Sequence, residues 1–484
     1  MSKDFLIDAI DCFISGDWGT DSYSIDTPIK VKCIRGADIN NINSNDVASI
    51  PTRYISERSL SNKTLSAGDI VVEKSGGSPT QSTGRVAYIS EHVVTSSDTV
   101  CSNFCTAFRV KDKWDSKYIY YYLRYIYDLG VFFNFEGKTS GIKNLDLERA
   151  YNSIPIKYIP KEKQQKVVKI LTLLDKKIEL NNKIISELEQ MAKELYDYWF
   201  VQFDFPDVNG TPYRSSGGKL TYNPILKREI PNDWEVKYLE SIAEIVGGST
   251  PSTENQEYFT NSGICWITPK DLSNTNGAKY IFKGEKDLTE LGIRSASLNV
   301  MPIGTVLMSS RAPVGYLSIS AIETTTNQGL KSFIPNKGWS TVYLYHTIKH
   351  IMPIIEARAT GSTFKEIAAS DLRGIYWYIP PKELTNIFSE EISSSEIKIR
   401  NSLIQNEELS QLRDWLLPML MNGQVSVQTV SKEETKKTTP IINLSQQQNQ
   451  RFELWLSNQG AAARGKIDKA TLREIFDAMD EDDK

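Results

Sequence analysis

The sequence predicts an α+β protein that contains one building block twice, a domain followed by a long helix. Strand and turn signals recur along the chain after about 220–236 residues, a period too long for a solenoid. Each copy is followed by a long segment in which apolar residues recur at heptad spacing. Two such blocks form a pseudo-two-fold object if their helices run antiparallel.

The composition is that of an ordinary globular protein: 484 residues, of which 40% are hydrophobic and 24% charged. It excludes fibrous, wholly disordered and small disulfide-rich chains, and the length suits about two to four domains. The first residues hold no apolar core of signal-peptide length, and no run of about 18 apolar residues predicts a membrane span. Five cysteines without framework spacing fit a reducing cytoplasm.

The formal net charge of −4 is carried by the last eight residues, which include five acids and one lysine. The rest of the chain is neutral overall. A neutral protein can still bind nucleic acid if its basic residues gather on one face, so the charge alone decides nothing.

Two pairs of segments define the repeat. Residues 68–90 and 304–320 each predict a strand, a loop of small residues and a second strand that ends in Ile-Ser. Residues 137–160 and 359–380 each predict a Gly/Ser/Thr loop, a basic residue and an apolar stretch that ends in Tyr-Ile-Pro. Proline at these ends suits the first turn of a helix.

Two spacer helices are expected at 161–201 and 381–423, the second ended by Pro418 and Gly423. Polar Asn181 interrupts the first apolar seam, and such a residue often fixes the register of a coiled coil at a cost in stability. The expected seam residues are Leu171, Leu174, Ile178, Asn181, Ile185, Leu188, Leu195, Ile392, Ile399 and Leu403. The other expected segments are a first domain 1–160, a connector 202–228, a second domain 229–380, a polar linker 424–446 and a small helical acidic extension 447–484.

Enzymatic motifs are missing. Methyl transfer to a DNA base would need a Gly-rich cofactor turn and an Asn/Asp-Pro-Pro-aromatic loop, and the sequence contains neither. Residues 215–220 (SSGGKL) resemble a phosphate loop, but Tyr213 stands where glycine is required and Leu220 where Ser or Thr is required. A Gly-rich turn is the better interpretation, and we expect no catalytic residue.

Metal sites are also not expected. His346 and His350 lie four apart on a predicted helix, but Thr347 replaces the glutamate of a metalloprotease, so a pair on the helix surface is favoured. His92, Cys101 and Cys105 could supply three zinc ligands, but a fourth is not nearby and the spacing is not standard.

The loops of the repeat offer small residues, amides and cations that suit phosphate and base contacts. Tight turns and helix capping are the alternative interpretation, but capping alone does not require the same loops in both copies. The candidate DNA-binding residues are Lys74, Ser75, Arg85, Lys138, Thr139, Lys143, Ser309, Arg311, Asn327, Gln328, Arg358, Ser362, Thr363 and Lys365.

Aromatic residues provide a weaker signal. Trp18, Tyr54, Trp114 and Tyr118–Tyr122 could stack on bases. Because residues 118–129 (YIYYYLRYIYDL) have an amphipathic pattern, an internal core helix is favoured.

Taken together, residues 229–274, the joint 212–220 (PYRSSGGKL) and the two repeat-plus-helix ends resemble the specificity subunits of type I DNA restriction–modification systems. The resemblance covers about residues 1–423, and the tail lies outside it.

The resemblance implies two mixed α/β target recognition domains, each of which reads half of a split, asymmetric double-stranded DNA sequence. It implies that the two long helices pack antiparallel and separate the domains. It also implies docking of two methyltransferase subunits, which bring S-adenosylmethionine, and of restriction/translocase subunits, which use ATP and Mg²⁺. The specificity subunit of this family binds no cofactor, has no catalytic residue and works in the cytoplasm.

Two alternatives stay open at this point. A coiled-coil scaffold without DNA contact explains the helices but not the duplicated loops. A specificity factor of a modification-only phage-defence system would share every feature above.

Overall fold

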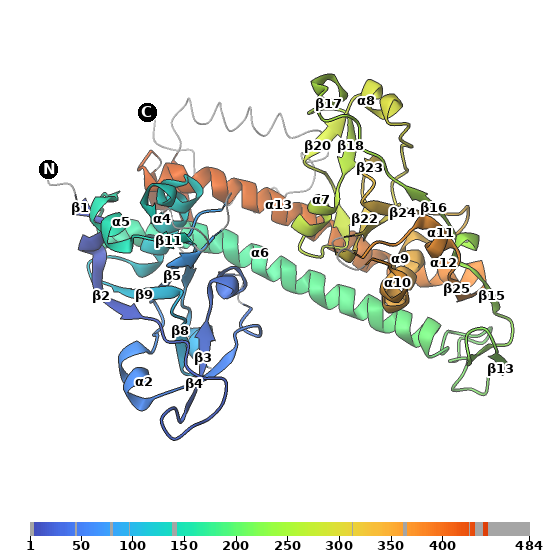
Figure 1. Cartoon of the computed structure of the whole chain (residues 1–484), viewed down its shortest axis with the longest axis horizontal. Helices are drawn as coiled ribbons and strands as arrows, with labels where there is room; N and C mark the ends of the chain where they lie inside the picture. The colour runs from blue at the N-terminus through green and yellow to red at the C-terminus, as the bar shows by residue number, and fades with distance from the viewer. Residues whose placement is uncertain are drawn as a thin grey trace. The chain divides into compact units, whose positions relative to one another are not determined.

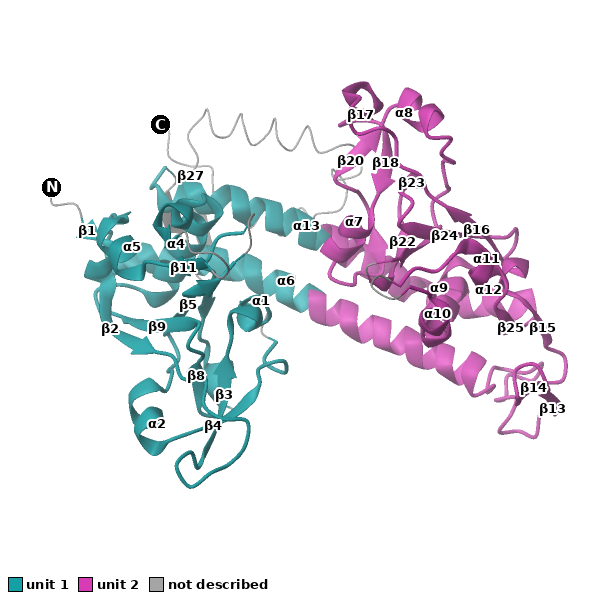
Figure 2. Cartoon of the chain, viewed as in Figure 1, with its two compact units in different colours: residues 1–181, 405–484 teal, residues 182–404 magenta. Residues whose placement is uncertain are grey.

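The computed structural model describes residues 4–43, 46–77, 81–95, 97–137, 143–311, 313–361 and 365–424, and the backbone of 426–430 and 439–443. The chain forms two compact units, residues 1–181 with 405–484 and residues 182–404 (Figure 2). Two long helices, α6 (Lys161–Tyr196) and α13 (Ser393–Met421), each contribute one part to either unit (Figure 1). None of the described helices is long and apolar enough to cross a membrane.

Two sheets form the first unit. One is antiparallel with strand order β2-β9-β5-β7; the other has the order β4-β3-β8, in which β3 and β8 run parallel. The strands are β2 (Ile10–Ser15), β9 (Cys105–Val110), β5 (Ile70–Glu73), β7 (Val86–Tyr88), β4 (Thr52–Ile55), β3 (Ile29–Ile34) and β8 (Thr99–Cys101). Shorter pairs join β1 (Asp4–Phe5) to β12 (Pro155–Ile156), and β11 (Lys143–Leu145) to β10 (Glu136–Gly137) and β6 (Ser75–Gly76).

The second unit repeats this plan. Its larger sheet has the order β16-β24-β21-β22-β19, and its smaller sheet, β17-β20-β18-β23, again pairs two strands in parallel, β18 and β23. The strands are β16 (Ala243–Gly247), β24 (Leu330–Pro335), β21 (Val306–Ser310), β22 (Val314–Ser320), β19 (Tyr280–Ile281), β17 (Phe259–Thr260), β20 (Lys286–Leu288), β18 (Ile264–Ile267) and β23 (Thr324–Thr326). Strands β13 (Leu220–Asn223) with β14 (Arg228–Pro231) and β15 (Glu235–Tyr238) with β25 (Tyr376–Ile379) form two-stranded pairs. The matching strand orders confirm the duplication that the sequence predicted.

Short helices complete the units. Those of the first unit are α1 (Ile39–Asn43), α2 (Glu57–Lys63), α3 (Glu91–Thr95), α4 (Ser116–Asp128) and α5 (Leu147–Ser153). Those of the second are α7 (Pro269–Asn274), α8 (Glu290–Ser295), α9 (Thr341–His350), α10 (Met352–Arg358), α11 (Ala369–Arg373) and α12 (Lys382–Glu391).

Helices α4 and α9 occupy equivalent places and are both buried. Trp114 stacks on Tyr118 with ring centroids 6.5 Å apart, and Trp339 stacks on Tyr343 at 6.2 Å. Because these rings lie in the cores rather than at the surface, residues 118–129 form the core helix that the amphipathic pattern favoured.

The long helices run antiparallel within the first unit. Asn181 Nδ2 on α6 donates to Gln405 Oε1 at 2.8 Å and to Asn406 Oδ1 at 2.9 Å on α13. Six residues earlier on α6, Asp175 accepts from Arg413, which lies later on α13. The polar residue of the seam therefore contacts polar residues of the partner helix, which fixes the register between them.

The predicted seam residues pack into the cores of their units. Leu171, Leu174, Ile185, Ile392 and Ile399 are buried. Ile178, Leu188, Leu195 and Leu403 are partly buried against the same cores.

The helix boundaries differ from the predicted 161–201 and 381–423. Helix α6 changes to a π-helical turn at Asp197–Val201, and the second segment is broken at Ile392 into α12 and α13. Pro418 lies inside α13, which continues to Met421. A proline so close to a helix end removes only one late hydrogen bond, and burial of the residues around it offsets that cost.

The segment predicted as a polar linker, 424–446, contains a two-stranded hairpin, β26 (Ser426–Val430) with β27 (Thr439–Asn443). Both strands include β-branched residues, which favour extended backbone. The two helices expected within 447–484 lie outside the described residues.

The Gly-rich joint between the copies is a turn, as the sequence favoured. The carboxylate of Asp204 accepts from the backbone N–H and the hydroxyl of Ser215, both at 2.7 Å, and Tyr213 stacks on Phe205 at 4.7 Å. A Cβ at Gly218 would lie 2.4 Å from the Tyr213 ring, so a glycine is needed there for packing.

Replacement of Ile399 by alanine tests the seam. Its side chain is fully buried at the helix-packed core of the second unit. We expect Ile399→Ala to lower the free energy of unfolding by about 2–5 kcal/mol, because the methyl groups lose burial and leave a cavity. Chemical denaturation followed by tryptophan fluorescence measures the loss. Ile397→Ala on the same helix, 59% exposed, is the matched control and should change stability little. Equal losses in both variants would contradict the seam.

Candidate nucleic-acid interface

In the first unit the two predicted loops lie side by side. Strand β6 pairs antiparallel with β11, so Gly76 faces Lys143 and Ser75 faces Asn144. The Ser75 hydroxyl donates to Asn144 Oδ1 at 2.5 Å, and the backbone N–H of Leu145 donates to the Lys74 carbonyl at 2.8 Å. Segments almost seventy residues apart in the chain therefore form one surface.

The second unit joins its loops in a similar way. Arg311 and Glu366 form an isolated antiparallel bridge, and the Ile367 N–H donates to the Ser310 carbonyl at 3.1 Å. The Arg311 guanidinium lies 4.0 Å from the Glu366 carboxylate, and both side chains are exposed. Solvent screens such a pair, so Arg311 can exchange this partner for another anion.

Arg85 forms an ion pair with Glu73 and is therefore not available for a DNA contact. Its Nε and Nη2 donate to the two carboxylate oxygens of buried Glu73, at 2.9 and 2.7 Å. The hydrogen bond to Glu73 raises the pKa of Arg85. Breaking this bidentate pair would leave a buried carboxylate unpaired, so Arg85 is a structural residue.

Ser309 and Arg358 are also used by the fold. The buried Ser309 hydroxyl donates to the Pro313 carbonyl and accepts from the Tyr316 N–H, both at 2.8 Å. The Arg358 guanidinium donates to the carbonyls of Asp371 and Gly374 at 3.1 and 3.0 Å. The sequence could not show these partners, and we withdraw both residues from the candidate contacts.

Of the remaining basic candidates in the flanking loops, Lys143 has an ion-pair partner and Lys365 has none among the described residues. Lys143 lies 3.0 Å from the Glu136 carboxylate and over the Phe133 ring. Lys365 is exposed and has no ion-pair partner within the described part of the chain. The candidates Lys138, Thr139, Ser362 and Thr363 lie outside the described residues.

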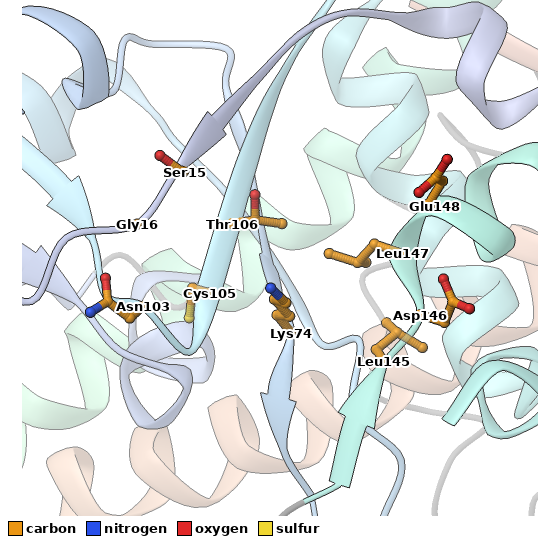
Figure 3. A pocket seen from close by; sticks show the side chains of 10 residues that line it. All are labelled: Ser15, Gly16, Lys74, Asn103, Cys105, Thr106, Leu145, Asp146, Leu147 and Glu148. Carbon is orange, nitrogen blue, oxygen red and sulfur yellow. The ribbon is translucent and has the colours of Figure 1, made fainter. Parts of the chain in front are cut away.

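Lys74 lies in a polar hollow of about 410 Å³ at the surface of the first unit. Figure 3 shows Lys74 between Asn103 and Ser15 on one side and Asp146 and Glu148 on the other. The hollow is lined by Ser15, Gly16, Lys74, Asn103, Cys105, Thr106, Leu145, Asp146, Leu147 and Glu148.

Backbone hydrogen bonds fix the position of Lys74 while its ammonium stays available. The N–H groups of Lys74 and Ser75 donate to the Phe104 carbonyl at 2.8 and 3.0 Å. The exposed ammonium forms no ion pair or hydrogen bond with any residue that the structure describes. Lys74 is therefore a cation on a rigid support with its charge directed to solvent.

In the second unit, polar side chains gather at the turn after β23. Asn327 Oδ1 accepts from the Gly329 N–H at 3.0 Å, and exposed Gln328 accepts from the Thr250 hydroxyl. The Lys331 ammonium donates to the Ser310 hydroxyl at 3.3 Å and to the Gln328 carbonyl at 3.4 Å. Burial lowers the pKa of Lys331.

Three further candidates, Asn103, Thr106 and Lys331, were not predicted from the sequence. They lie in structurally equivalent segments of the two copies, residues 99–108 (TVCSNFCTAF) and 324–333 (TTTNQGLKSF). The two segments share no motif, so the shared strand pairing was needed to align them.

Each unit also holds a carboxylate that joins the domain to the long helices, half-buried Asp175 in the first and buried Glu396 in the second. In the first, Asp175 of α6 accepts from the Tyr121 hydroxyl at 2.6 Å and from Arg413 at 3.0 Å. In the second, Glu396 of α13 accepts from the Lys279 ammonium at 2.5 Å and from the Tyr280 hydroxyl at 2.6 Å.

The prediction that His346 lies on a helix surface was wrong. His346 is buried, and its Nε2 lies 3.2 Å from the Lys279 ammonium. Burial, followed by repulsion from Lys279, lowers the pKa of His346 well below its ordinary value. His350 is half-buried, 3.8 Å from Asp197, and its pKa is lowered by burial.

The cysteines considered for zinc are free thiols. Burial raises the pKa of Cys105 to about 12 and also raises that of Cys101, which disfavours the thiolate that zinc requires. Among the described residues, no group of three or more His, Cys, Asp or Glu side chains is arranged to hold a metal ion.

The family model described as "Type I restriction modification DNA specificity domain" matches residues 26–190 and 231–394, more than half of the chain. The chain belongs to this family. One match falls in each copy, so each copy contains a DNA specificity domain of this family, as the resemblance implied.

Curated relatives of this chain come from archaea and bacteria. It is 37% identical over 208 residues to the MjaIX specificity subunit of Methanocaldococcus jannaschii, covering 43% of this chain and 47% of the relative. It is 28% identical over 323 residues to the HindI specificity subunit of Haemophilus influenzae, covering 57% and 70% of the two chains. The chain thus spans about half the length of the first relative.

The S subunit of a type I restriction–modification system from M. genitalium has a similar fold, with a TM-score of 0.52 at 14% identity. The alignment covers 87% of this chain and 95% of that one. This similarity confirms the predicted fold of two mixed α/β domains with long helices.

The low pKa of His346 predicts that the specificity subunit loses stability in mild acid. Below about pH 6.5 the unfolded chain binds a proton at this histidine that the folded chain does not bind. We expect the free energy of unfolding to fall by up to about 1.4 kcal/mol per pH unit for this group between pH 6.5 and 5. Denaturant titrations across this range measure the slope.

His346→Gln should reduce the slope, because glutamine can still accept from Lys279 but does not titrate. His92→Gln, at an exposed position of the first unit, is the control. Equal slopes in the wild type and the H346Q variant would refute the assignment.

Proposed function

We propose that this chain recognises a bipartite, asymmetric double-stranded DNA target, with residues 1–160 reading one half and residues 229–380 the other. One observation carries the proposal: both units present the same pair of sheets but different side chains at equivalent places. Thr106 of β9, for example, corresponds to Lys331 of β24, since Val72 and Met308 face them from equivalent strands. Because the two units share a fold but differ in the side chains that could contact DNA, we expect them to recognise different half-site sequences.

The proposed partners supply the chemistry. Two methyltransferase subunits that carry S-adenosylmethionine would methylate adenine in the recognised target. Restriction/translocase subunits that use ATP and Mg²⁺ would cleave unmethylated DNA. The specificity subunit itself would bind none of these cofactors, and the complex would work in the cytoplasm.

An apolar stripe on α6 supports docking of a methyltransferase subunit. Leu173 and Leu180, both within the first unit, are each 51% exposed, and their spacing of seven residues places them on one face of the helix. Exposed apolar side chains gathered in this way are typical of a surface that another protein covers.

The scaffold alternative is not favoured, because the chain belongs to a DNA specificity family. A modification-only system would lack the restriction step. A plaque assay distinguishes the two systems, because only a complete restriction system should reduce plaque formation by phage with unmethylated DNA.

Exchange of one domain tests whether each domain recognises one half of the DNA target. We expect that replacing residues 1–160 by the corresponding domain of another specificity subunit changes one half of the methylated motif and leaves the other half intact. Single-molecule sequencing of genomic DNA, from cells that also contain the methyltransferase partner, measures the motif. The reciprocal exchange of residues 229–380 should change only the other half. A change of both halves in either chimera would contradict the proposal.

Introduction of a charge into the stripe tests the docking surface. We expect Leu180→Asp to reduce co-purification of the methyltransferase subunit at least tenfold, because the carboxylate would lose its hydration in the interface. Ser186→Asp adds the same charge at an exposed position about one third of a turn away from the stripe. Pull-down and quantitative mass spectrometry compare the two variants, and equal binding would exclude the stripe as the contact.

A further inference from the structure

We propose that one lysine and one amide side chain at the same place in each unit select bases of the two half-sites: Lys74 with Asn103, and Lys331 with Gln328. The inference rests on the proposed DNA-reading function and assigns residues to it.

The strand register places the two pairs equivalently. In the first unit Val72 of β5 faces Thr106 of β9, and Lys74 lies two residues beyond Val72. In the second, Met308 of β21 faces Lys331 of β24 directly. The lysine therefore follows β5 in the first unit and lies on β24, the neighbouring strand of the sheet, in the second. In both units it lies beside the turn that leads into β9 or its counterpart β24.

The same turn carries the amide. Asn103 lies two residues before β9, and Gln328 lies two residues before β24. Both side chains are exposed. The Lys331 ammonium donates to the backbone carbonyl of Gln328 at 3.4 Å, while the side-chain oxygen of Gln328 accepts from the Thr250 hydroxyl. Lys74 and Asn103 line one hollow (Figure 3). Each unit therefore combines a cation and an amide at one point of its surface.

Glycine fixes this turn in both units. A Cβ at Gly16 would lie 2.0 Å from the Ser102 carbonyl oxygen, and a Cβ at Gly248 would lie 2.2 Å from the Asn327 carbonyl oxygen. Only glycine permits so close an approach of two backbones. Because Ser102 precedes Asn103 as Asn327 precedes Gln328, the same contact holds each amide in place.

The surroundings favour a base edge over a phosphate as the ligand of Lys74. The carboxylates of Asp146 and Glu148 line the opposite wall of the hollow. They would repel a phosphate but not a neutral base. Asp146 also accepts from the Arg149 N–H at 3.0 Å, which fixes one of these carboxylates at the start of α5.

The donors suggest purines. A lysine ammonium donates to guanine O6 and N7 in the major groove, and an Asn or Gln amide pairs with adenine N6 and N7. Half-buried Lys331 already donates to Ser310 and Gln328, which leaves it a third N–H for a base. We therefore expect a guanine to be read by the lysine in each half-site and an adenine next to it.

Single-residue variants in the full complex test this assignment. The variants are Lys74→Gln and Asn103→Ala in the first unit, and Lys331→Gln and Gln328→Ala in the second. Exposed Lys157→Gln and Lys337→Gln are the matched controls. Each complex is produced in cells with its methyltransferase partner, and genomic methylation is mapped by single-molecule sequencing.

We expect each lysine variant to relax discrimination at one position by roughly 5- to 150-fold, in its own half of the motif only. The Asn103→Ala and Gln328→Ala variants should relax a neighbouring position of the same half, and the controls should keep the wild-type motif.

Three results would overturn the inference: an unchanged motif, a change in both halves, or an equal loss of methylation at all sites without relaxed sequence choice. The last result is that of a phosphate contact. Failure of the proposed function itself is distinguishable, because the wild-type complex would then show no preferred sequence at all.

Discussion

A hydrogen-bonded carboxylate on each long helix is the constraint on which the packing of domain against helix depends within each unit. Asp175 and Glu396 each lie fifteen positions after the proline that precedes their helical segment. Each accepts hydrogen bonds from its own domain; Glu396 is buried, and Asp175 is half-buried. A carboxylate withdrawn from water without such partners is costly, most of all at Glu396, so these hydrogen bonds hold each domain against its helices.

This attachment lets loop sequences vary without loss of the scaffold. The strands that the two units share follow the same order, each sheet of the second unit having one strand more, and the close contacts of Gly16 and Gly248 are present in both. Residues beside these contacts differ, as Lys74 stands in one unit and Ser310 in the other. A protein that must read two different DNA sequences can therefore use one fold twice.

The candidate site was predictable as a region but not as a set of residues. The recurrence of small-residue loops indicated where Lys74 and Arg311 lie. It could not show that Arg85 pairs with Glu73 or that Ser309 is buried, because both contacts depend on how the two strands that flank each loop pair, and the small-residue pattern does not specify that register. A composition-based choice of cations cannot separate a free lysine from a structural arginine.

The sequence alone determined the duplication, the long helices and the apolar seam, because these depend on local periodicity that each segment carries by itself. Tertiary structure decided which side chains remain free, how the loops pair across the sheets and why His346 is buried. It also decided that Lys331 takes the place of Lys74 on a neighbouring strand. Those features depend on contacts between segments remote in sequence, and strand register, not motif, brings such segments together.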